Sequence, residues 1–453
     1  LWGPPSGGPI RLKPDPTPES SRKSVRTLSA SCALLVLAGA PQAQVPTPVD
    51  RVTFQQAIDR ATQNNPSVAV AAAAILRAEG LLGQARAGTR LVVTGNVTTT
   101  TLNTGTEFQG STVTPQNQVT ASVTATMPIV AAAAWARRAQ AEDTRQVATL
   151  GAAETRRQVA LATADAYLTV IARRRLIEGN TRARDTAQAH YDLASQLEQQ
   201  GTGSRLNTLR AQQQWSTDEG LLESATLAVY RAQEALGVLL VANGPVDAID
   251  EPSFQLPPDA AGVAAQPGNL APSLMAFRTD LKLLTGQKQA AERVLGDSSK
   301  DLWPTLDAVF LPQTIYPTPF FSSANSWRFL LQGSVPVFSG GLQTSVKVQR
   351  QAAVDAADAN LTGALSQAAS QVRAARTAVA SGERSLVSIR AAADQAQQVV
   401  TIVNVSFRAG AATNIEVIDA ERSARDADTA AATAEDTLRR ARFDLLLASG
   451  RFP

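Results

Sequence analysis

The sequence predicts a mainly helical fold with a smaller β part, built from two tandem copies of one plan. Two segments, 386–407 and 417–445, carry apolar residues at alternating steps of three and four, as long coiled-coil helices do. Two other segments, 119–127 and 327–335, alternate along one face with a period of two, as strands do. Because the helices are too long for a compact globular domain, we expect antiparallel helical hairpins joined to β-hairpins.

The repeat is visible as three motif pairs in the same order along both halves of the chain, about 208 residues apart. The pairs are Asn65-Pro66-Ser67-Val68 with Ala271-Pro272-Ser273-Leu274, Met127-Pro128-Ile129 with Val335-Pro336-Val337, and residues 201–211 with residues 410–420. These pairs predict a first structural repeat over 44–245 and a second over 273–453, joined by a proline-rich linker over 246–272.

The amino-terminal region, residues 1–43, has the layout of an upstream extension followed by a secretory signal peptide. Residues 1–21 are rich in proline and glycine, and Val25 is a candidate for the true start. Basic residues then precede the apolar run 32–38, which is too short to span a bilayer, and we expect cleavage near Ala43. An apolar patch in a disordered tail is the alternative. The single cysteine, Cys32, lies at the start of the apolar run, whereas a lipoprotein cysteine follows such a run, so neither a disulfide nor a lipid anchor is predicted.

The first repeat opens with two predicted helices. Thr53 and Gln56 have the spacing of a capping box for the first helix, and Pro66 marks its end. The second helix is predicted over 67–86. A β-hairpin follows over about 91–129.

In that first β-hairpin, the strand over 119–127 alternates cleanly, whereas the strand over 91–101 carries threonine on both faces. Each strand has about ten residues, the length of a tilted transmembrane β-strand. We expect Pro128 to close the hairpin. A long helical hairpin then follows, with its tip at about 200–204.

The second repeat carries a β-hairpin over about 305–337, with strands predicted at 305–311 and 327–337. Seven aromatic residues gather around it, as in an interfacial girdle: Trp303, Phe310, Tyr316, Phe320, Phe321, Trp327 and Phe329. A soluble hairpin that packs its aromatic residues inward is the alternative.

The last helical hairpin has its predicted tip at about 407–414. Gly410 can take the left-handed conformation that ends the first helix, which is expected over about 343–409. Thr413 and Glu416 have the spacing of a capping box that opens the second helix.

Four strands cannot close a barrel, and an open edge in lipid leaves backbone groups unpaired at several kcal/mol each. The strands must therefore pair between subunits. Two chains would supply eight strands and a filled interior, whereas three would supply twelve strands and room for a lumen. Three chains are therefore the smallest number that leaves room for a conducting lumen.

Nothing in the sequence indicates catalysis or a bound cofactor. The only histidine, His190, is interpreted as a surface residue, and no phosphate-binding loop or nucleophile elbow occurs. The formal charge of +3 is scattered, without a basic patch interleaved with aromatic residues, so nucleic acid is not an expected partner.

In their order and duplication, these residues resemble the TolC-like outer-membrane efflux protein family, also called outer membrane factors. The resemblance covers about residues 49–448. The motifs that carry it are Val52-Thr-Phe-Gln-Gln-Ala57, Asn64-Asn-Pro66, Trp303-Pro304, Val335-Pro-Val-Phe-Ser-Gly-Gly341, Phe407-Arg-Ala-Gly410 and Ile415-Glu-Val-Ile-Asp-Ala420. Two departures occur: no proline precedes the first strand near Arg90, and Asn207 stands where an acidic residue is common.

The resemblance implies a homotrimer with a twelve-stranded barrel in outer-membrane lipid and a twelve-helix periplasmic tunnel. It also implies two partners, a periplasmic adaptor (a membrane fusion protein) and an inner-membrane pump. The expected function is a passive exit duct for small molecules such as drugs. The alternatives are a duct for type I protein secretion or metal efflux, and a periplasmic coiled-coil scaffold without a pore.

By the same resemblance, Glu416 and Asp419 point into the narrow periplasmic end of the tunnel. Six carboxylates of a trimer would there form a cation-preferring constriction. A purely structural role is the alternative, because acids near a helix start are favoured by the helix dipole by about 0.3 to 1 kcal/mol.

The helical tips are the expected contact sites for the adaptor, through Gly201, Gly203, Gly410 and Ala411. Their alternative role is that of helix turns alone. Arg205 and Arg210 lie near the same end and could lock a closed tip by pairing with neighbouring acids. The alternative, which we favour, is that both arginines are solvated at the surface.

Overall fold

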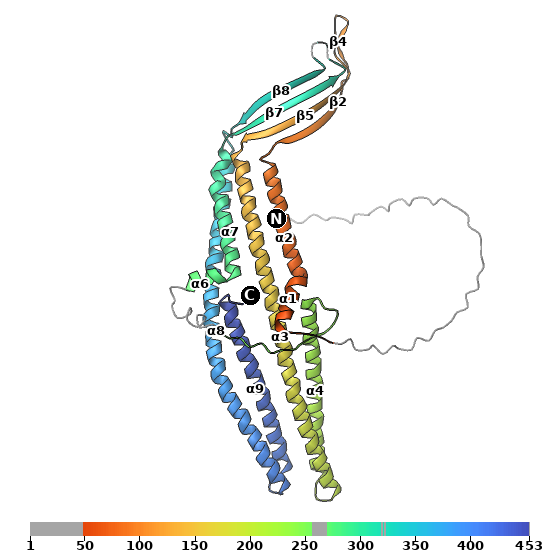
Figure 1. The fold of residues 1–453 in the computed structure, drawn as a ribbon, viewed down its shortest axis with the longest axis vertical. Coiled ribbons are helices and arrows are strands. Elements are labelled where there is room, and N and C mark those ends of the chain that lie inside the picture. The colour runs from red at the N-terminus through yellow and green to blue at the C-terminus, as the bar shows by residue number, and fades with distance from the viewer. Residues whose placement is uncertain (1–48, 256–269, 319, 321–322, 453) are drawn as a thin grey trace, which may run out of the picture. The chain divides into compact units, whose positions relative to one another are not determined.

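The computed structural model describes residues 49–255, 270–318, 320 and 323–452, with no side-chain description for 270–273. The predicted signal peptide, most of the predicted linker and Phe321 lie outside the described residues. The described elements include long helices, which form two antiparallel hairpins, and a four-stranded sheet. The sheet lies at the end of the helices opposite the hairpin tips (Figure 1). Both the helical and the strand parts of the predicted fold class are present.

Local signals decide where the first helices begin and end. Helix α1 (Phe54–Asn64) is opened by the predicted capping box, in which the Gln56 amide donates to Thr53 Oγ1 at 3.3 Å. Helix α2 (Pro66–Ala87) starts with its proline in the first turn, where no backbone donor is needed. The Asn65 side chain accepts a hydrogen bond from the Ser67 amide at 3.0 Å and caps this helix.

The four-stranded sheet is antiparallel throughout, in the order β2-β5-β7-β8. Its strands are β2 (Val92–Thr101), β5 (Asn117–Val130), β7 (Thr305–Tyr316) and β8 (Asn325–Ser334). Strand β5 pairs with β7 and so joins the two β-hairpins into one sheet, which leaves β2 and β8 as the two edges. Within this chain those edges have no strand partner among the described residues.

Two strand boundaries differ from the sequence predictions. Pro128 does not close the first hairpin, because β5 continues to Val130 and pairs with β7 across a register shift between Pro128 and Val130. Strand β7 likewise continues beyond Leu311 to Tyr316. In both strands the pairing with a distant partner outweighs the local effect of a proline. A short hairpin, β3 (Thr106–Phe108) and β4 (Ser111–Thr114), stands in the loop after β2 and was not predicted.

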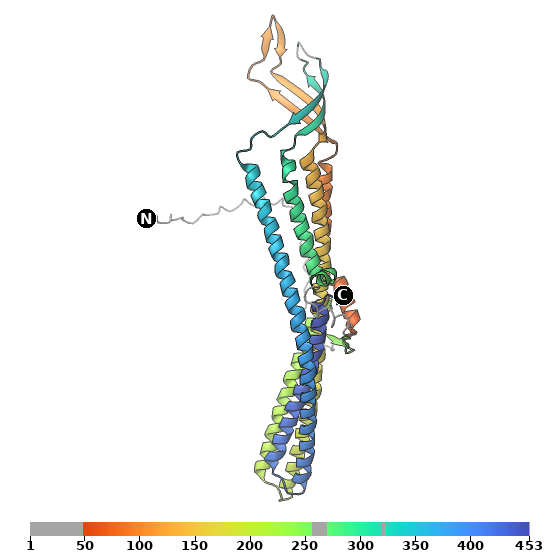
Figure 2. The same ribbon diagram turned by 90° about the vertical axis from the view of Figure 1, so that its left-hand side faces the viewer.

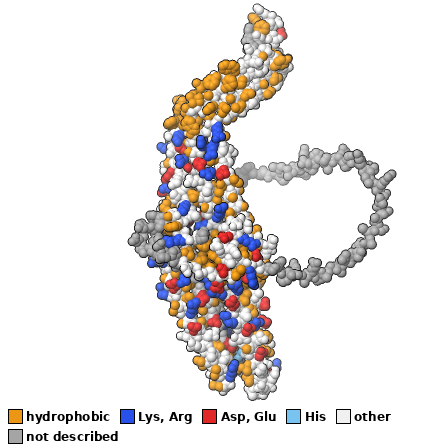
Figure 3. All heavy atoms as spheres, viewed as in Figure 1, with side chains coloured by type: hydrophobic (Ala, Val, Ile, Leu, Met, Phe, Trp, Pro, Cys, Tyr) orange, Lys and Arg blue, Asp and Glu red, His pale blue; other side chains and the backbone are white. Residues whose placement is uncertain are grey.

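The sheet exposes its apolar face more than its polar face. In β5, Val119, Val123 and Met127 are exposed, while the threonines and serine that alternate with them are half-buried. Val97 on the edge strand β2 is 75% exposed. Figure 3 shows hydrophobic side chains gathered over the sheet, whereas charged side chains cover the helices. This distribution is the reverse of that expected for a sheet in water.

The helical hairpins consist of α3 (Ala132–Gln199) with α4 (Arg205–Leu240) and α8 (Leu342–Arg408) with α9 (Asn414–Ala448). Figure 2 shows both hairpins reaching the end opposite the sheet. The predicted seam residues are the less exposed ones, since Ala393 in α8 and Val417, Ala420 and Ala424 in α9 are buried. Small seam residues let the helix backbones approach closely. Near the sheet, α2 and α7 (Thr279–Gly296) pack along α3.

A separate core lies midway along the helices, around Tyr167 of α3. It is covered by a two-stranded parallel sheet of β1 (Asp50–Val52) and β6 (Val246–Ala248). The buried Tyr167 hydroxyl lies 3.2 Å from the Val52 carbonyl oxygen and also contacts the Asp250 carboxylate. Burial, with the Asp250 contact adding to it, raises the pKa of this hydroxyl. The remaining short elements are α6 (Leu270–Phe277) and a 3-10 turn, η3 (Asp297–Leu302).

Much apolar helix surface is left uncovered. Among the described helices, α2 alone is long and apolar enough to cross a membrane. It packs along α3, but only 17% of its most apolar stretch is buried. Val70 and Leu76 of α2, and Val387 and Ile402 of α8, are exposed. Because large apolar patches on a protein mark interaction surfaces, this helical surface is suited to contact other chains.

Candidate functional site at the helical tips

Two glycines turn the chain at the tips in the same way. Gly201 and Gly410 both have φ of +76°, the left-handed conformation that glycine adopts without strain. After them, the Thr202 amide donates to the Leu197 carbonyl at 3.0 Å and the Ala411 amide to the Ser406 carbonyl at 2.8 Å. These bonds satisfy the carbonyl groups left free at a helix end.

The tip glycines differ in how much room surrounds them. A Cβ atom on Gly203 would lie 2.7 Å from the Glu198 backbone nitrogen, so this position requires glycine for the turn itself. Around Gly201 and Gly410, by contrast, no described atom beyond the adjoining residues lies within 4 Å of the Cβ position. A side chain at Gly410 would therefore strain the backbone without colliding with its own chain.

Glu416 and Asp419 lie one turn apart on the exposed side of α9. The Glu416 Oε2 atom accepts a hydrogen bond from the Thr413 amide at 2.7 Å, which is the predicted capping-box contact. Both acids are exposed, whereas Val417, Ile418 and Ala420 between and beside them are buried against the neighbouring helices. The two carboxylates thus share a surface that this chain leaves open.

The prediction that His190 is a surface residue is wrong. Its side chain is 5% exposed, and its Nε2 atom lies 2.6 Å from Oδ1 of Asn414, which is 3% exposed. The Asn414 amide nitrogen donates to the Asn207 carbonyl at 3.3 Å, and the His190 ring lies beside Phe407. This set joins all four helices at the tip end, and we call it the tip bridge.

A sequence signal for the burial of His190 did exist. Ala187, His190 and Ala194 are spaced by three and four residues on α3 and are all buried, so the histidine occupies a seam position. Burial lowers the pKa of His190 below its ordinary value of 6.5, although the contact with Asn414 opposes this shift. His190 is therefore neutral at neutral pH, and the tip bridge contains no net charge.

Two further sets of polar contacts join the hairpins above the tip bridge. In the first, Arg425 of α9 pairs with the buried Asp218 of α4, which also accepts from Gln214 at 2.9 Å. In the second, nearer the core, Arg175 and Asp165 of α3 pair with Glu435 and Arg440 of α9 at 2.8 and 2.6 Å. Sequence reasoning missed these pairs, because a charge on a helix surface does not reveal which distant helix it meets.

Arg205 and Arg210 are exposed, and neither forms an ion pair within the described chain. The described residues also contain no group of three or more His, Cys, Asp or Glu side chains placed to hold a metal ion.

Comparison with known proteins identifies what this arrangement is similar to. A family model described as "Outer membrane efflux protein" matches residues 57–240 and 281–451. No curated protein matches the chain significantly. Among solved structures, the outer membrane protein VceC of Vibrio cholerae matches with a TM-score of 0.75 and 19% identity, covering 88% of this chain and 96% of VceC.

Two further solved structures have the same fold. The Campylobacter jejuni CmeC outer membrane channel matches with a TM-score of 0.75 and 14% identity, covering 88% of this chain and 86% of that one. The Neisseria gonorrhoeae MtrE outer membrane channel, solved in an open state, matches with a TM-score of 0.71 and 17% identity, covering 88% of both chains.

We predict that His190→Ala destabilises the protein by about 1 to 3 kcal/mol, because it leaves the buried Asn414 oxygen without its hydrogen-bond partner. We expect faster amide hydrogen exchange over residues 414–418 at about pH 7.5. Because the pKa of His190 is lowered, its stabilising contribution is complete above pH 6.5 and is lost as the pH falls through the lowered pKa. In the wild type, protection of residues 414–418 against exchange should therefore decrease as the pH falls through this range. In His190→Ala this pH-dependent decrease should be absent.

Arg210→Ala is the matched control, since Arg210 is exposed near the same tip, and it should leave the exchange of residues 414–418 unchanged. Equal protection in His190→Ala and the wild type would show that the bridge does not hold the tip.

Proposed function

Because the chain belongs to the outer membrane efflux protein family, we propose that it is the outer-membrane exit duct of a tripartite efflux system. The observation that carries this proposal is the four-stranded sheet, which has an exposed apolar face and two edges without a strand partner among the described residues. A non-pore scaffold in the periplasm would leave that face in water. The mature protein resides in the outer membrane, after removal of the signal peptide.

The active form is a homotrimer that closes one barrel. In the order β2-β5-β7-β8, successive strands alternate in direction, so β8 of one chain would run antiparallel to β2 of the next. Three chains then form a continuous twelve-stranded barrel without an edge. The outward face carries Val97, Val123 and Phe329 toward lipid, while Asn96, Ser122 and Arg328 line a polar lumen.

The helices continue the barrel as a tunnel across the periplasm. The exposed apolar residues of α2 and α8 would be covered by the helices of neighbouring subunits. At the far end, Glu416 and Asp419 of three chains form a cation-preferring constriction. The tips around Gly201, Gly203, Gly410 and Ala411 dock with a periplasmic adaptor, which connects the duct to an inner-membrane pump.

The cargo is proposed to be small molecules, such as drugs, that the pump selects. Metal efflux and type I protein secretion would use the same duct with a different pump. Transport through the duct is passive and involves no catalytic step, because the groups proposed to act are an electrostatic constriction and a docking surface.

The orientation of the sheet predicts opposite effects for two adjacent residues. Val123→Arg places a charge on the lipid-facing side, at a cost of up to about 2 to 4 kcal/mol near the bilayer midplane. We expect it to reduce the fraction of protein that assembles into lipid vesicles as a heat-modifiable trimer. Ser122→Arg, on the polar face, is the matched control and should assemble like the wild type; equal assembly of both variants would contradict the barrel.

The constriction is tested by Glu416→Gln with Asp419→Asn. Removing six carboxylates from the trimer should reduce cation selectivity and abolish block by multivalent cations in planar bilayer recordings. Glu219→Gln, an exposed acid on α4, serves as the control. Unchanged conductance, selectivity and block in the double variant would overturn the assignment.

The docking role is tested at Gly410, where a side chain has room within its own chain. Gly410→Trp should abolish drug resistance in an efflux-dependent strain while trimers still form. Gly410→Ala introduces the same backbone strain without bulk, at about 1 kcal/mol, and should retain most of the resistance. Normal resistance with Gly410→Trp would show that no partner sits on this tip.

A further inference from the structure

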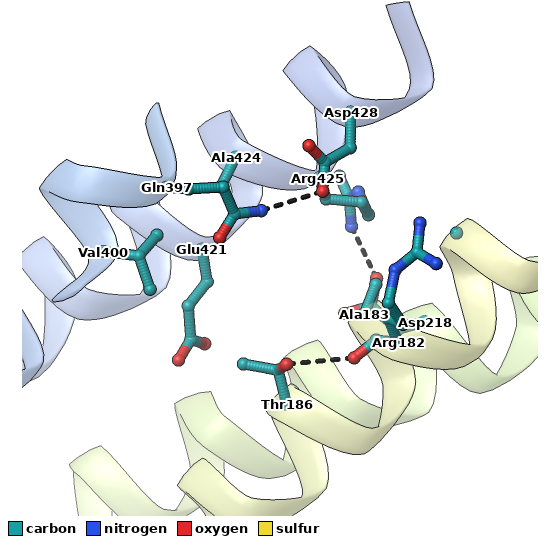
Figure 4. Close-up of a pocket in the computed structure, with 11 residues that line it drawn as sticks. Arg182, Ala183, Thr186, Asp218, Gln397, Val400, Glu421, Ala424, Arg425 and Asp428 are labelled. Atoms are coloured by element: carbon teal, nitrogen blue, oxygen red, sulfur yellow. Dashed lines mark hydrogen bonds and ion pairs between the residues drawn. The ribbon is translucent and has the colours of Figure 1, made fainter. Parts of the chain in front are cut away.

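A cavity of about 170 Å³ lies between the two helical hairpins, next to the contact between Asp218 and Arg425. All four long helices contribute to its lining, as Figure 4 shows. Its volume is enough for several water molecules. The side chain of Glu421 extends from α9 across this cavity toward Thr186 of α3 (Figure 4).

Glu421 differs from the other acids around the cavity because one of its oxygens is buried without a partner among the described residues. Its Oε2 atom is buried and makes no hydrogen bond among the described residues. Asp218 is held by Arg425 and Gln214, and Asp428 accepts from Gln397 of α8 at 2.8 Å. An ionised carboxylate with a buried, unpaired oxygen is strongly disfavoured, whereas a protonated one carries no charge to solvate.

The charges that face Glu421 come from three of the helices. Arg182 lies on α3, Asp218 on α4, and Arg425 and Asp428 on α9; α8 contributes neutral side chains only. Arg425 is already shared, because it pairs with Asp426 of its own helix as well as with Asp218. Burial raises the pKa of Glu421 to about 7, and the charge of Asp218 adds to this shift.

We propose that Glu421 is a proton-operated latch between the two helical hairpins. Its neutral form is compatible with the packed arrangement, in which Arg425 is available to Asp218. Its ionised form is repelled by the charge of Asp218 and draws water or a counter-ion into the cavity. Ionisation therefore weakens the contacts of α9 with α3 and α4. This proposal concerns the packing of the hairpins within one chain and holds whether or not the protein conducts.

The direction of the pH dependence follows from linkage. Because the pKa of Glu421 is raised in the packed state, its contribution to packing is complete below the ordinary glutamate pKa and is lost as the pH rises through about 7. His190, near the same end of α3, acts in the opposite direction at lower pH. Above about pH 6.5 His190 is neutral, so of these two residues only Glu421 changes its charge.

The first experiment measures protonation directly. Infrared difference spectra of the purified protein, recorded from about pH 6.5 to about pH 8.5, should show a protonated carboxyl C=O stretch that disappears as the pH rises. The band should be absent from Glu421→Gln and retained in Glu219→Gln, the exposed acid next to Asp218. Absence of the band from the wild type at the lower pH would overturn the proposal.

The second experiment measures the separation of the hairpins. Spin labels at Gln200→Cys and Ala411→Cys, diluted into unlabelled subunits, report the distance between the two tips of one chain. We expect the distribution to shift to longer distances as the pH rises in the wild type and in Glu219→Gln. In Glu421→Gln it should remain short at every pH. A shift that persists in Glu421→Gln, or no shift in the wild type, would refute the latch.

Discussion

The sheet depends on the requirement that backbone N–H and C=O groups be hydrogen-bonded wherever water is excluded. Strands β2 and β8 carry such groups along two free edges, and the sheet between them turns its apolar face outward. A single chain in lipid would leave these edges unpaired at several kcal/mol for each group. Membership in the outer membrane efflux protein family and the geometry of the sheet therefore lead to the same proposal, a barrel completed by further chains.

The helical part follows a different rule, because its seams contain many alanines and few large side chains. Such seams allow close approach of helices but bury little apolar area in each turn. Between the hairpins, polar contacts at three levels supplement the packing: the tip bridge, the pair of Asp218 with Arg425, and the pairs of Arg175 and Asp165. These contacts depend on charge and geometry, so they can be altered without unfolding either hairpin.

The titratable groups of the tip respond to pH in opposite directions. Burial keeps His190 neutral, so acidic pH destabilises the tip bridge. Burial of Glu421 favours its protonated form, so alkaline pH destabilises the neighbouring contact of Asp218 with Arg425. If both residues act as inferred, the packed arrangement is most stable at intermediate pH. The exposed pair of Glu416 and Asp419 lies on α9 between Asn414 of the tip bridge and Glu421, so a change in hairpin packing would also move the proposed constriction.

Much of this protein was predictable from the sequence, because the relevant interactions are local. Helical and strand periods, the capping boxes at Thr53 and Thr413, and the left-handed turn at Gly410 depend on residues a few positions apart. The order of the motifs was also enough to suggest the family. Local signals failed where a distant strand decided the outcome, as at Pro128, which remains within β5 because β7 pairs with it.

The tertiary structure alone decided which polar side chains are buried and which groups they meet. His190 and Asn414 are 224 positions apart, and Arg425 and Asp218 are 207 apart. No periodicity in one segment specifies such a partner, because the approach of two hairpins depends on the packing of all four helices. The sequence proposed Glu416 and Asp419 through the family resemblance but did not single out Glu421, because its unpaired oxygen is a property of the surrounding cavity.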